Sequence, residues 1–543
     1  MQSSPKSQAH GGVRGANLSR SSSLFAGPFG RMFRALPPAE FGPDDKSTLV
    51  NLELLAAAMM SKRDDTDPKD GPDPREGGIP AAYTYFGQFV DHDLTFDPAS
   101  SLQRQNDLDA LVDYRTPRFD LDSLYGRGPD DQPYMYKEDR RHFVLGTPLH
   151  GGGSRGARDL QRNSEDPARA LIGDPRNDEN VVVAQLHGLW QRFHNKLAGA
   201  HERWSFVEVQ QQVRFHYQWI LLHDFLPMIV AESVLRDVLP IGGDGELIAD
   251  VSNLKHFHFR KEPFMPLEFS VAAYRFGHTM VRPGYRLNDE TDPLPIFLPR
   301  KRGRPRDDEF DLRGGKAPRE DWAIDWKRFI DLEPLPYGSR RRTDQSNKNR
   351  LQLAFRIDTS LVNPLRNLPN FSPSILALRN LERGWRLRLP SGQDVAKAMG
   401  LTPLTDNKIR IGMFTGKRSD IVERSILDVD TKPAKAGTGR KIAKRNQDSV
   451  FRENCPLWTY VLAETIEEID LVKTKHGGKV IEKKIKTRRL GPVGGRIVAE
   501  TFLGLMLADS SSYLSLNPHW KPDSKLTVKG KFGLREMISF TLK

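Results

Sequence analysis

The sequence is poor in cysteine and has no long uninterrupted apolar run. Cys455 is the only cysteine among 543 residues, so no disulfide can form within the chain and the fold does not depend on an oxidising compartment. The most apolar helical stretch, residues 217–235, is interrupted by His223, Asp224 and Pro227. This pattern predicts a buried helix and not a membrane span.

The first residues lack the apolar core of a secretory signal. Residues 1–22 are rich in serine, glycine and basic residues, which is typical of a flexible tail. We expect residues 23–543 to form one domain with charged insertions near residues 299–322 and 405–450, because no repeat or clean linker divides them. A protein that stays in the cytoplasm, or leaves it by a non-classical route, fits these features.

Basic residues outnumber acidic ones by 82 to 70, and the excess gathers in short runs. One run, "KRGRPR" at residues 301–306, is similar to the core of the AT hook, in which an extended Arg-Gly-Arg-Pro segment fits a narrow minor groove. A single copy beside the acidic "DDEFD" is more often a solvated loop. DNA binding is therefore a lesser alternative.

Apolar residues recur mostly at helical spacing from residue 49 onward, so the expected fold class is mainly α with little β. Pro80 suits the first turn of a helix, which predicts a helix from Ile79 and Pro80 to about Leu94. A second, long amphipathic helix follows the segment "DPRNDEN", with Asn177 or Asp178 as its expected N-cap.

The first of these helices carries an imidazole and carboxylates within an aromatic run, "YFGQFVDHDLTF" at residues 85–96. Gln88 and His92 are four residues apart and share a helix face, with Asp91 on its flank. In "DPRNDEN" at residues 174–180, Arg176 and Glu179 are three apart and would point the same way. Each motif alone is more often structural than functional.

Two further segments contain residues of interest nearer the carboxyl end. In residues 269–287, His278 lies in a helical run that Pro283 should end, and Gly277 leaves room for a flat group to approach. In "LALRNLERGW" at residues 376–385, Asn380 and Arg383 share a helix face.

Together these residues supply what peroxide chemistry at a haem iron requires. The iron needs one fixed imidazole ligand whose second nitrogen has a partner, and His278 with Asn380 can form that pair. On the open side a neutral histidine can move a proton between the two peroxide oxygens, and an arginine can stabilise the charge that develops. His92 and Arg176 can form this second pair.

These segments resemble, in order along the chain, those of the animal-type haem peroxidase family of the peroxidase and cyclooxygenase superfamily. The sequence is identified as a bacterial member, and the resemblance spans about residues 24–520. It extends to four further segments: "RTPRFDLDSLYG" (115–126), "FHNKLA" (193–198), "HDFLP" (223–227) and "LGPVGGRIVAETF" (490–502).

The resemblance implies a role for each matched residue. The distal residues would be His92 as acid and base, Gln88 as a hydrogen-bond donor and Arg176 as the catalytic arginine. On the proximal side, His278 would be the axial ligand of the haem iron, Asn380 its partner and Arg383 a contact to a haem propionate.

The family joins haem b to the protein through ester bonds, and the matching carboxylates here are Asp91 and Glu179. Many mammalian members form a third link from a methionine directly after that glutamate. Asn180 occupies this position here. We therefore do not expect the third link or a strong capacity to oxidise halides.

The residue after the distal histidine binds calcium in the family, together with a T-x-x-x-D-x-S loop. This resemblance implies calcium ligands at Asp93, Thr116, the Arg118 carbonyl, Asp120 and Asp122, in the segment "TPRFDLD". Oxygen-rich ligands suit a hard cation, and Asp122 in place of serine adds a carboxylate.

The implied function is a peroxidase that uses hydrogen peroxide to oxidise a small electron donor, whether phenolic, halide, pseudohalide or lipid-derived. The main alternative is a fatty-acid dioxygenase of the same superfamily, whose radical tyrosine lies three residues before the proximal histidine. Arg275 has that position here, and Tyr274, one residue away, is turned by about 100° on a regular helix. Tyr274 would therefore need a local distortion to take that role. A non-catalytic scaffold is disfavoured because every expected haem-site residue is present.

Overall fold

The computed structural model of the chain describes twelve segments of it. They are residues 29–61, 70–95, 117–243, 246–259, 263–298, 310–335, 345–368, 372–415, 424–429, 449–476, 479–486 and 488–543. Thr116 and the "KRGRPR" segment at residues 301–306 lie outside the described residues.

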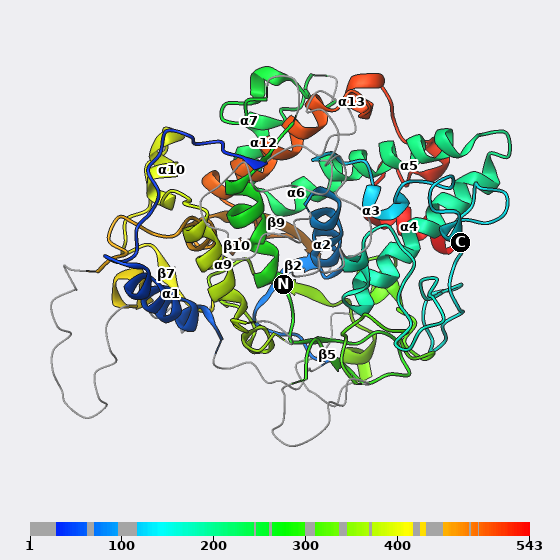
Figure 1. The fold of residues 1–543 in the computed structure, drawn as a ribbon, viewed down its shortest axis with the longest axis horizontal. Coiled ribbons are helices and arrows are strands. Elements are labelled where there is room, and N and C mark those ends of the chain that lie inside the picture. Colours follow the sequence, from blue (N-terminus) through cyan, green and yellow to red (C-terminus); the bar gives the residue numbers. More distant parts are fainter. Residues whose placement is uncertain are drawn as a thin grey trace, which may run out of the picture.

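The described fold is mainly α, as the apolar spacing predicts (Figure 1). Its α-helices are α1 (Asp45–Met59), α2 (Ala82–Leu94), α3 (Asp122–Tyr125), α4 (Val181–Ala200), α5 (Phe206–Ile220), α6 (Leu226–Ile229), α7 (Glu232–Val238), α8 (Gly277–Met280), α9 (Leu376–Arg386), α10 (Gly392–Ala398), α11 (Leu457–Glu464), α12 (Pro492–Ala508), α13 (Tyr513–Leu516) and α14 (Leu534–Leu542).

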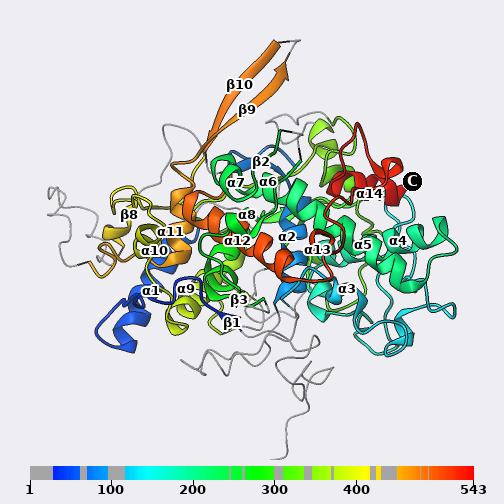
Figure 2. The same ribbon diagram turned by 90° about the horizontal axis from the view of Figure 1, so that it is seen from above.

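The strands form short two-stranded pairs and no larger sheet among the described residues. The pairs are β1 (Phe29–Gly30) with β3 (Met265–Pro266), β2 (Glu76–Pro80) with β6 (Leu353–Phe355), β4 (Gly284–Tyr285) with β5 (Leu294–Pro295), β7 (Arg410–Ile411) with β8 (Arg424–Ser425), and β9 (Ile469–His476) with β10 (Lys479–Lys486). The β9–β10 hairpin extends away from the helical body (Figure 2).

Helix α2 lies near the middle of the molecule in both views and packs against α4 (Figures 1 and 2). Phe86 and Phe89 on α2 both stack on Trp190 of α4, and both meet Tyr217 of α5 edge to face. Aromatic pairs of these geometries add to the stabilisation from burial. The aromatic residues around His92 therefore anchor α2 in the core.

Two predicted helix starts are wrong by a few residues. Pro80 ends strand β2 and does not begin α2, because β2 pairs with β6 up to Pro80 and Leu353. Helix α4 begins at Val181, and its N-cap is Asn180, whose side-chain oxygen accepts from Val182 N and Val183 N. The expected cap Asn177 lies instead in a 3-10 turn, Pro175–Asp178, which precedes the helix.

The segment before His278 is not a regular helix. A π-helical turn, Glu268–Ala272, is followed by a 3-10 turn, Ala273–Phe276, and then by α8. π turns widen a helix and 3-10 turns tighten it, so side-chain directions here depart from the 100° spacing.

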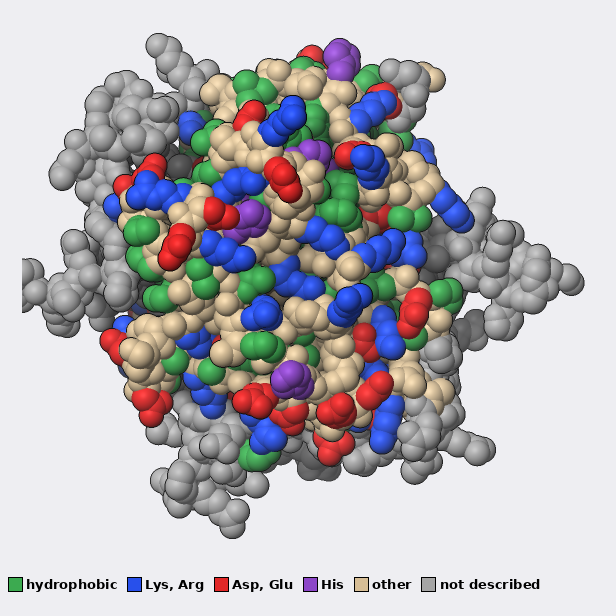
Figure 3. All heavy atoms as spheres, turned by 90° about the vertical axis from the view of Figure 1, so that its right-hand side faces the viewer, with side chains coloured by type: hydrophobic (Ala, Val, Ile, Leu, Met, Phe, Trp, Pro, Cys, Tyr) green, Lys and Arg blue, Asp and Glu red, His purple; other side chains and the backbone are tan. Residues whose placement is uncertain are grey.

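Charge is mixed on the face at the right of Figure 1, over α4, α5 and the carboxyl-terminal helix. Lys and Arg side chains are interspersed there with Asp and Glu, which gather toward one edge (Figure 3). In the part of the chain that the structure describes, none of the helices combines the length and the apolar composition needed to cross a bilayer.

Candidate active site

A cavity of 880 Å³ lies between α2, α8 and α9. This volume falls within the roughly 300–1,000 Å³ of typical ligand and cofactor sites. Its walls contain all eight residues to which the sequence assigns a haem-related role: Gln88, Asp91, His92, Arg176, Glu179, His278, Asn380 and Arg383. The structure thus brings together residues that are up to 295 positions apart, counted from Gln88 to Arg383.

His92 is 4% exposed, and its ring forms a hydrogen bond with the Asn177 side chain. Its Nδ1 is 2.8 Å from Asn177 Oδ1, so the imidazole donates a hydrogen bond to the amide oxygen. A neutral ring that donates from Nδ1 keeps a lone pair on Nε2. Nε2 lies 3.5 Å from Glu179 Oε1 on the cavity side. The distal imidazole can therefore accept a proton from a molecule in the cavity.

Arg176 is fixed at the cavity wall by Asp174, which is fully buried. The Arg176 Nη2 atom is 2.8 Å from one carboxylate oxygen of Asp174 and donates to the His92 carbonyl at 3.0 Å. Charge-assisted bonds of this kind hold a guanidinium more firmly than neutral ones. A fixed positive charge therefore lies beside His92.

Gln88 and Glu179 form the rim next to His92. The Gln88 amide nitrogen donates to Glu179, while its oxygen accepts from Asn180 Nδ2 at 3.1 Å. The Glu179 side chain is 48% exposed and so remains open to the cavity. Burial opposes ionisation of Glu179, but surrounding contacts, the charge of Arg176 and the hydrogen bond from Gln88 among them, outweigh it and hold the pKa of Glu179 below its usual value.

His278 and Asn380, which also line the cavity, contact each other. The Asn380 Nδ2 atom donates to His278 Nδ1 at 2.9 Å, which leaves the imidazole proton on Nε2. An axial ligand needs the reverse arrangement, in which Nδ1 donates and Nε2 is free. A half-turn of the Asn380 amide supplies that arrangement without a change of size. Burial, followed by the charge of Arg275, lowers the pKa of His278 to about 4, so its ring is neutral near pH 7.

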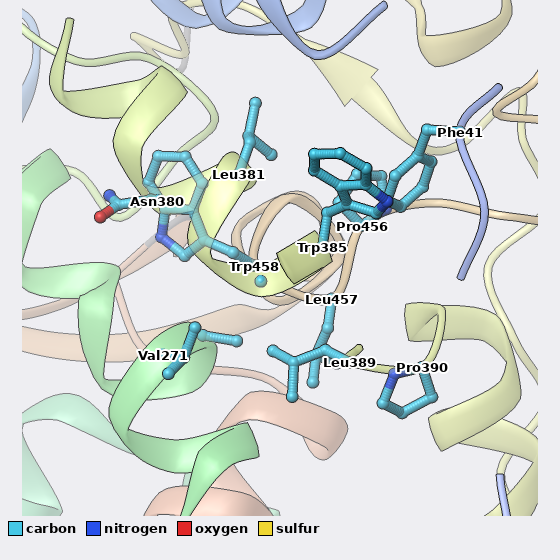
Figure 4. A pocket seen from close by; sticks show the side chains of 12 residues that line it. Phe41, Val271, Asn380, Leu381, Trp385, Leu389, Pro390, Pro456, Leu457 and Trp458 are labelled. Carbon is cyan, nitrogen blue, oxygen red and sulfur yellow. The ribbon is translucent and has the colours of Figure 1, made fainter. Parts of the chain in front are cut away.

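A small apolar cavity of 20 Å³ lies behind Asn380 (Figure 4). Leu381, Trp385 and Trp458 are among the side chains that surround it. An apolar space of this size offers a water molecule few hydrogen-bond partners. The packing therefore leaves little room for water on this side of Asn380.

Asp91 contacts Arg275. From the sequence, Arg275 was notable only because it occupies the position of the radical tyrosine of the dioxygenases. The Arg275 Nη1 atom is 3.4 Å from Asp91 Oδ2, and its Nε donates to the Ser270 carbonyl at 2.8 Å. Burial opposes ionisation of Asp91, but nearby positive charges, that of Arg275 first, outweigh it and hold its pKa below the usual value. Asp91 is thus kept as a carboxylate at the cavity edge.

Tyr274 also lines the cavity. It lies in the 3-10 turn Ala273–Phe276, a local distortion of the kind that a role as radical tyrosine would require. Its hydroxyl donates to the Gly87 carbonyl of α2 at 3.3 Å, and its ring stacks on Phe269. Burial raises its pKa well above the usual value, so the phenol is neutral. The local distortion that Tyr274 would need in order to face the cavity is therefore present.

Three of the expected calcium ligands lie together on the far side of α2. Oxygen atoms of Asp93, Asp120 and Asp122 are all within 4.8 Å of one another, and Asp93 is fully buried. Burial, and then the charges of Asp120 and Asp122, raise the pKa of Asp93 well above its usual value. The Arg118 side chain points elsewhere, with its Nε 3.8 Å from Asp509 Oδ1.

Sequence reasoning missed four residues that support the site: Asp174, Asn177, Asn180 and His187. The first three belong to the "DPRNDEN" segment, where an acid or amide is also the usual signal of a helix cap. His187 carried no local signal, because a lone histidine on an apolar helix is normally structural.

Parts of the chain match known proteins in sequence. Residues 147–301 match the sequence profile described as animal haem peroxidase. Human thyroid peroxidase is 35% identical over 274 residues, which are 48% of this chain and 26% of that protein. Drosophila melanogaster peroxidasin is 28% identical over 148 residues, which are 25% of this chain and 9% of that protein. These alignments therefore span only about a tenth to a quarter of the relatives.

Solved structures extend the likeness in fold to nearly the whole chain. Peroxidase A from Dictyostelium discoideum superposes with a TM-score of 0.55 at 15% identity, covering 99% of this chain and 98% of that one. A fatty acid alpha-dioxygenase from Oryza sativa superposes with a TM-score of 0.50 at 14% identity, covering 96% and 80%. At this identity the likeness concerns the fold alone.

The fold is thus shared with a peroxidase and with a fatty acid alpha-dioxygenase. Over residues 147–301 the chain is similar to the animal haem peroxidase family.

Proposed function

We propose that the protein is a haem-dependent peroxidase that reduces hydrogen peroxide with electrons from a small donor. The observation that carries the proposal is that His92 on α2 and His278 on α8 line one cavity, each with an asparagine at its Nδ1. Peroxide chemistry at haem needs such a pair, because one imidazole ligates and the other moves protons.

The residues present fit a haem group. A side-chain carbon added at Gly277 would meet nothing within 4 Å, so the space next to His278 is open to a flat group. Neutral His278 can offer Nε2 to iron once the Asn380 amide turns, and no charge has to be removed from the ring. Arg379 and Arg383 line the same cavity and suit the two propionates.

Bound haem would supply a redox-active iron at which the O–O bond of peroxide breaks. The Nε2 atom of His92 would take a proton from one peroxide oxygen and give it to the other, which leaves as water. Arg176, held by Asp174, would stabilise the negative charge that develops on the leaving oxygen. Electrons from the donor then restore the resting enzyme. Phenols, halides, pseudohalides and lipid-derived donors remain candidates.

Covalent attachment of haem through Asp91 and Glu179 is a separate part of the proposal. Both carboxylates line the cavity and both are held ionised by neighbouring cations. Attachment at Asp91 would break its 3.4 Å contact with Arg275. Haem that leaves the protein in acid-acetone after peroxide cycling would contradict this part. Haem that is retained by the wild type and released by Asp91→Asn with Glu179→Gln would support it.

Calcium at Asp93, Asp120 and Asp122 would stabilise the distal side of the site. Three carboxylates this close repel one another, and a divalent cation offsets that repulsion. Asp93 directly follows His92 on α2, so a cation there would fix the backbone that carries the distal imidazole.

A fatty-acid dioxygenase is the second candidate, and the position of Tyr274 favours it. The tyrosine lies in the cavity wall and its phenol is neutral, so it could lose a hydrogen atom to an oxidant in the cavity. The peroxidase remains preferred, because Arg275 pairs with Asp91 at the position where the dioxygenases have their radical tyrosine.

One experiment separates the two candidates. The full chain, supplied with haem and calcium, is mixed with hydrogen peroxide and guaiacol, iodide or thiocyanate, and separately with linoleate and oxygen. If the protein is a peroxidase, at least one donor should be oxidised and little oxygen should be taken up. Oxygen uptake with linoleate that disappears in Tyr274→Phe, without donor oxidation, would establish the dioxygenase instead.

A further inference from the structure

Three buried side chains from three elements form a chain of hydrogen bonds behind the distal imidazole. His92 on α2 contacts Asn177 in the 3-10 turn Pro175–Asp178, and Asn177 contacts His187 on α4. The Asn177 and His187 side chains are fully buried, and His92 is 4% exposed. Only His92 reaches the cavity wall, so the other two cannot touch a bound molecule there.

The polarity of this chain follows from the orientation of the Asn177 amide, whose nitrogen faces His187 and whose oxygen faces His92. Burial lowers the pKa of His187 to about 3, so that ring is neutral and its Nδ1 can accept a hydrogen bond. The Asn177 amide nitrogen donates to that atom at 3.1 Å. This contact turns the amide oxygen toward His92, whose Nδ1 donates to it at 2.8 Å. His92 therefore has its proton on Nδ1 and a lone pair on Nε2.

The opposite orientation of the amide would have the opposite effect on His92. An amide nitrogen facing Nδ1 would leave the ring proton on Nε2, where it points to the cavity. A distal imidazole in that state cannot take a proton from peroxide. The direction of one buried amide thus decides whether His92 can begin the reaction.

The surroundings hold this amide in place. Asn177 is tied to the start of its turn, because its backbone N–H donates to the Asp174 carbonyl at 3.0 Å. The His187 ring packs edge to face against Phe89 of α2 at 6.1 Å. Its Nε2 has no hydrogen-bond partner among the described residues, so the chain of contacts ends there. An amide left without partners at a fully buried position would cost about 1–3 kcal/mol, which favours the bonded arrangement.

We propose that Asn177 is a positioning residue that sets the tautomer of His92, and that His187 sets the orientation of the Asn177 amide. The inference rests on the proposed function and deepens it. Asn177 does not touch peroxide in this account; it acts only through the ring that does.

The kinetic test compares two substitutions at one position in the haem-loaded full chain. Asn177→Leu removes the acceptor, and the rate constant of the reaction with hydrogen peroxide should fall about 10- to 100-fold, as for other partners of functional histidines. Asn177→Asp keeps an acceptor and should restore most of the rate. The later oxidation of the donor should be unchanged in both variants, because that step does not need His92 as a base.

Asn195→Leu is the matched control. Asn195 is a partly buried asparagine whose amide accepts from Phe143 N at 2.7 Å and donates to Phe143 O at 2.9 Å, away from the cavity. This variant should lose stability and keep the peroxide rate. A wild-type peroxide rate in Asn177→Leu would overturn the proposal, as would equal losses in the Leu and Asp variants.

A spectroscopic test requires neither haem nor activity. In the haem-free full chain labelled with ¹⁵N-histidine, the His92 signals are identified by their loss in His92→Gln. The proposal expects a protonated Nδ1 and an unprotonated Nε2 in the wild type, and a mixture of tautomers in His187→Phe. A proton on Nε2 in the wild type would overturn it. Absence of any peroxide reaction would refute the proposed function alone, and the tautomer would still decide this inference.

Discussion

The Asn180 side chain joins helix α4 to Gln88 in the cavity rim across a hydrogen bond of 3.1 Å. Its oxygen caps α4 by accepting from Val182 N and Val183 N, and its nitrogen donates to the Gln88 oxygen. Gln88 is thereby turned so that its own nitrogen faces Glu179. Asn180, which stands where many mammalian members of the family have a haem-linked methionine, thus has two structural roles.

Two substitutions of Asn180 should separate these roles. Asn180→Asp keeps the helix cap and loses the donor to Gln88, so the peroxide reaction should slow about 2- to 10-fold, the equivalent of one hydrogen bond of roughly 0.5–1.5 kcal/mol, with little loss of stability. Asn180→Met loses the cap as well and should unfold about 1 kcal/mol more easily. Stopped-flow kinetics and urea unfolding measure the two effects. Equal stability of the two variants would contradict the capping role.

Calcium should stabilise the wild-type chain strongly and the Asp93→Asn variant weakly. At a concentration 100 times its dissociation constant a bound ion contributes about 2.7 kcal/mol. Without calcium, Asp93→Asn should be the more stable protein, because one of three repelling carboxylates has lost its charge. Melting temperatures with calcium and with EDTA test both statements. Asp250→Asn, at an exposed turn, is the control and should respond to calcium as the wild type does. A wild-type melting temperature that is the same in calcium and EDTA would argue against the site.

Asp224 should make the fold less stable as the pH rises through about 6. Its burial raises its pKa to about 6, while it accepts from Tyr83 Oη at 2.9 Å and Leu534 N at 2.8 Å. Because the folded value is the higher one, the contribution is complete below about pH 4 and is lost as the pH passes 6. Asp224→Asn keeps an acceptor without the charge. The wild type should lose up to roughly 3 kcal/mol relative to this variant between pH 4 and pH 8, because one pKa unit corresponds to about 1.4 kcal/mol. Parallel pH profiles of the two melting temperatures would rule this out.

Asn380 should control both the affinity for haem and its reduction potential. Asn380→Leu leaves His278 Nδ1 without its partner, and haem affinity should fall about 10- to 100-fold. Asn380→Asp supplies a charged acceptor, makes the imidazole a stronger donor to iron and should lower the reduction potential. Haem titration and spectroelectrochemistry are the measurements. Asn253→Leu at an exposed turn is the control, and an unchanged potential in Asn380→Asp would show that the two residues do not interact in the loaded protein.

Local spacing was enough to predict which side chains share a helix face. Gln88 with His92, and Asn380 with Arg383, line the cavity because the i, i+4 and i, i+3 relations hold on α2 and α9. The resemblance of the short motifs also implied one haem site for His278 and His92, and both residues line the cavity.

Tertiary packing decided what the spacing could not. Asn177 carries the same cap signal as Asn180, and only the 3-10 turn before α4 shows that one binds His92 and the other caps the helix. Tyr274 enters the cavity because a π turn precedes it, and such turns are not visible in an apolar pattern. The sequence does not connect His187 with the site. The connection follows from the packing of α4 against α2.

If His278 holds a haem group at which His92 reacts with peroxide, substitutions of the two histidines should have different effects. The wild type, His278→Ala and His92→Ala are loaded with haem, and their Soret spectra are recorded before and after addition of hydrogen peroxide. The account predicts that His278→Ala binds haem poorly. It also predicts that His92→Ala binds haem normally and reacts with peroxide about 10²- to 10⁴-fold more slowly, the range of one general acid and base. A wild-type chain without a Soret band, or a His92→Ala variant that reacts as the wild type does, would contradict it.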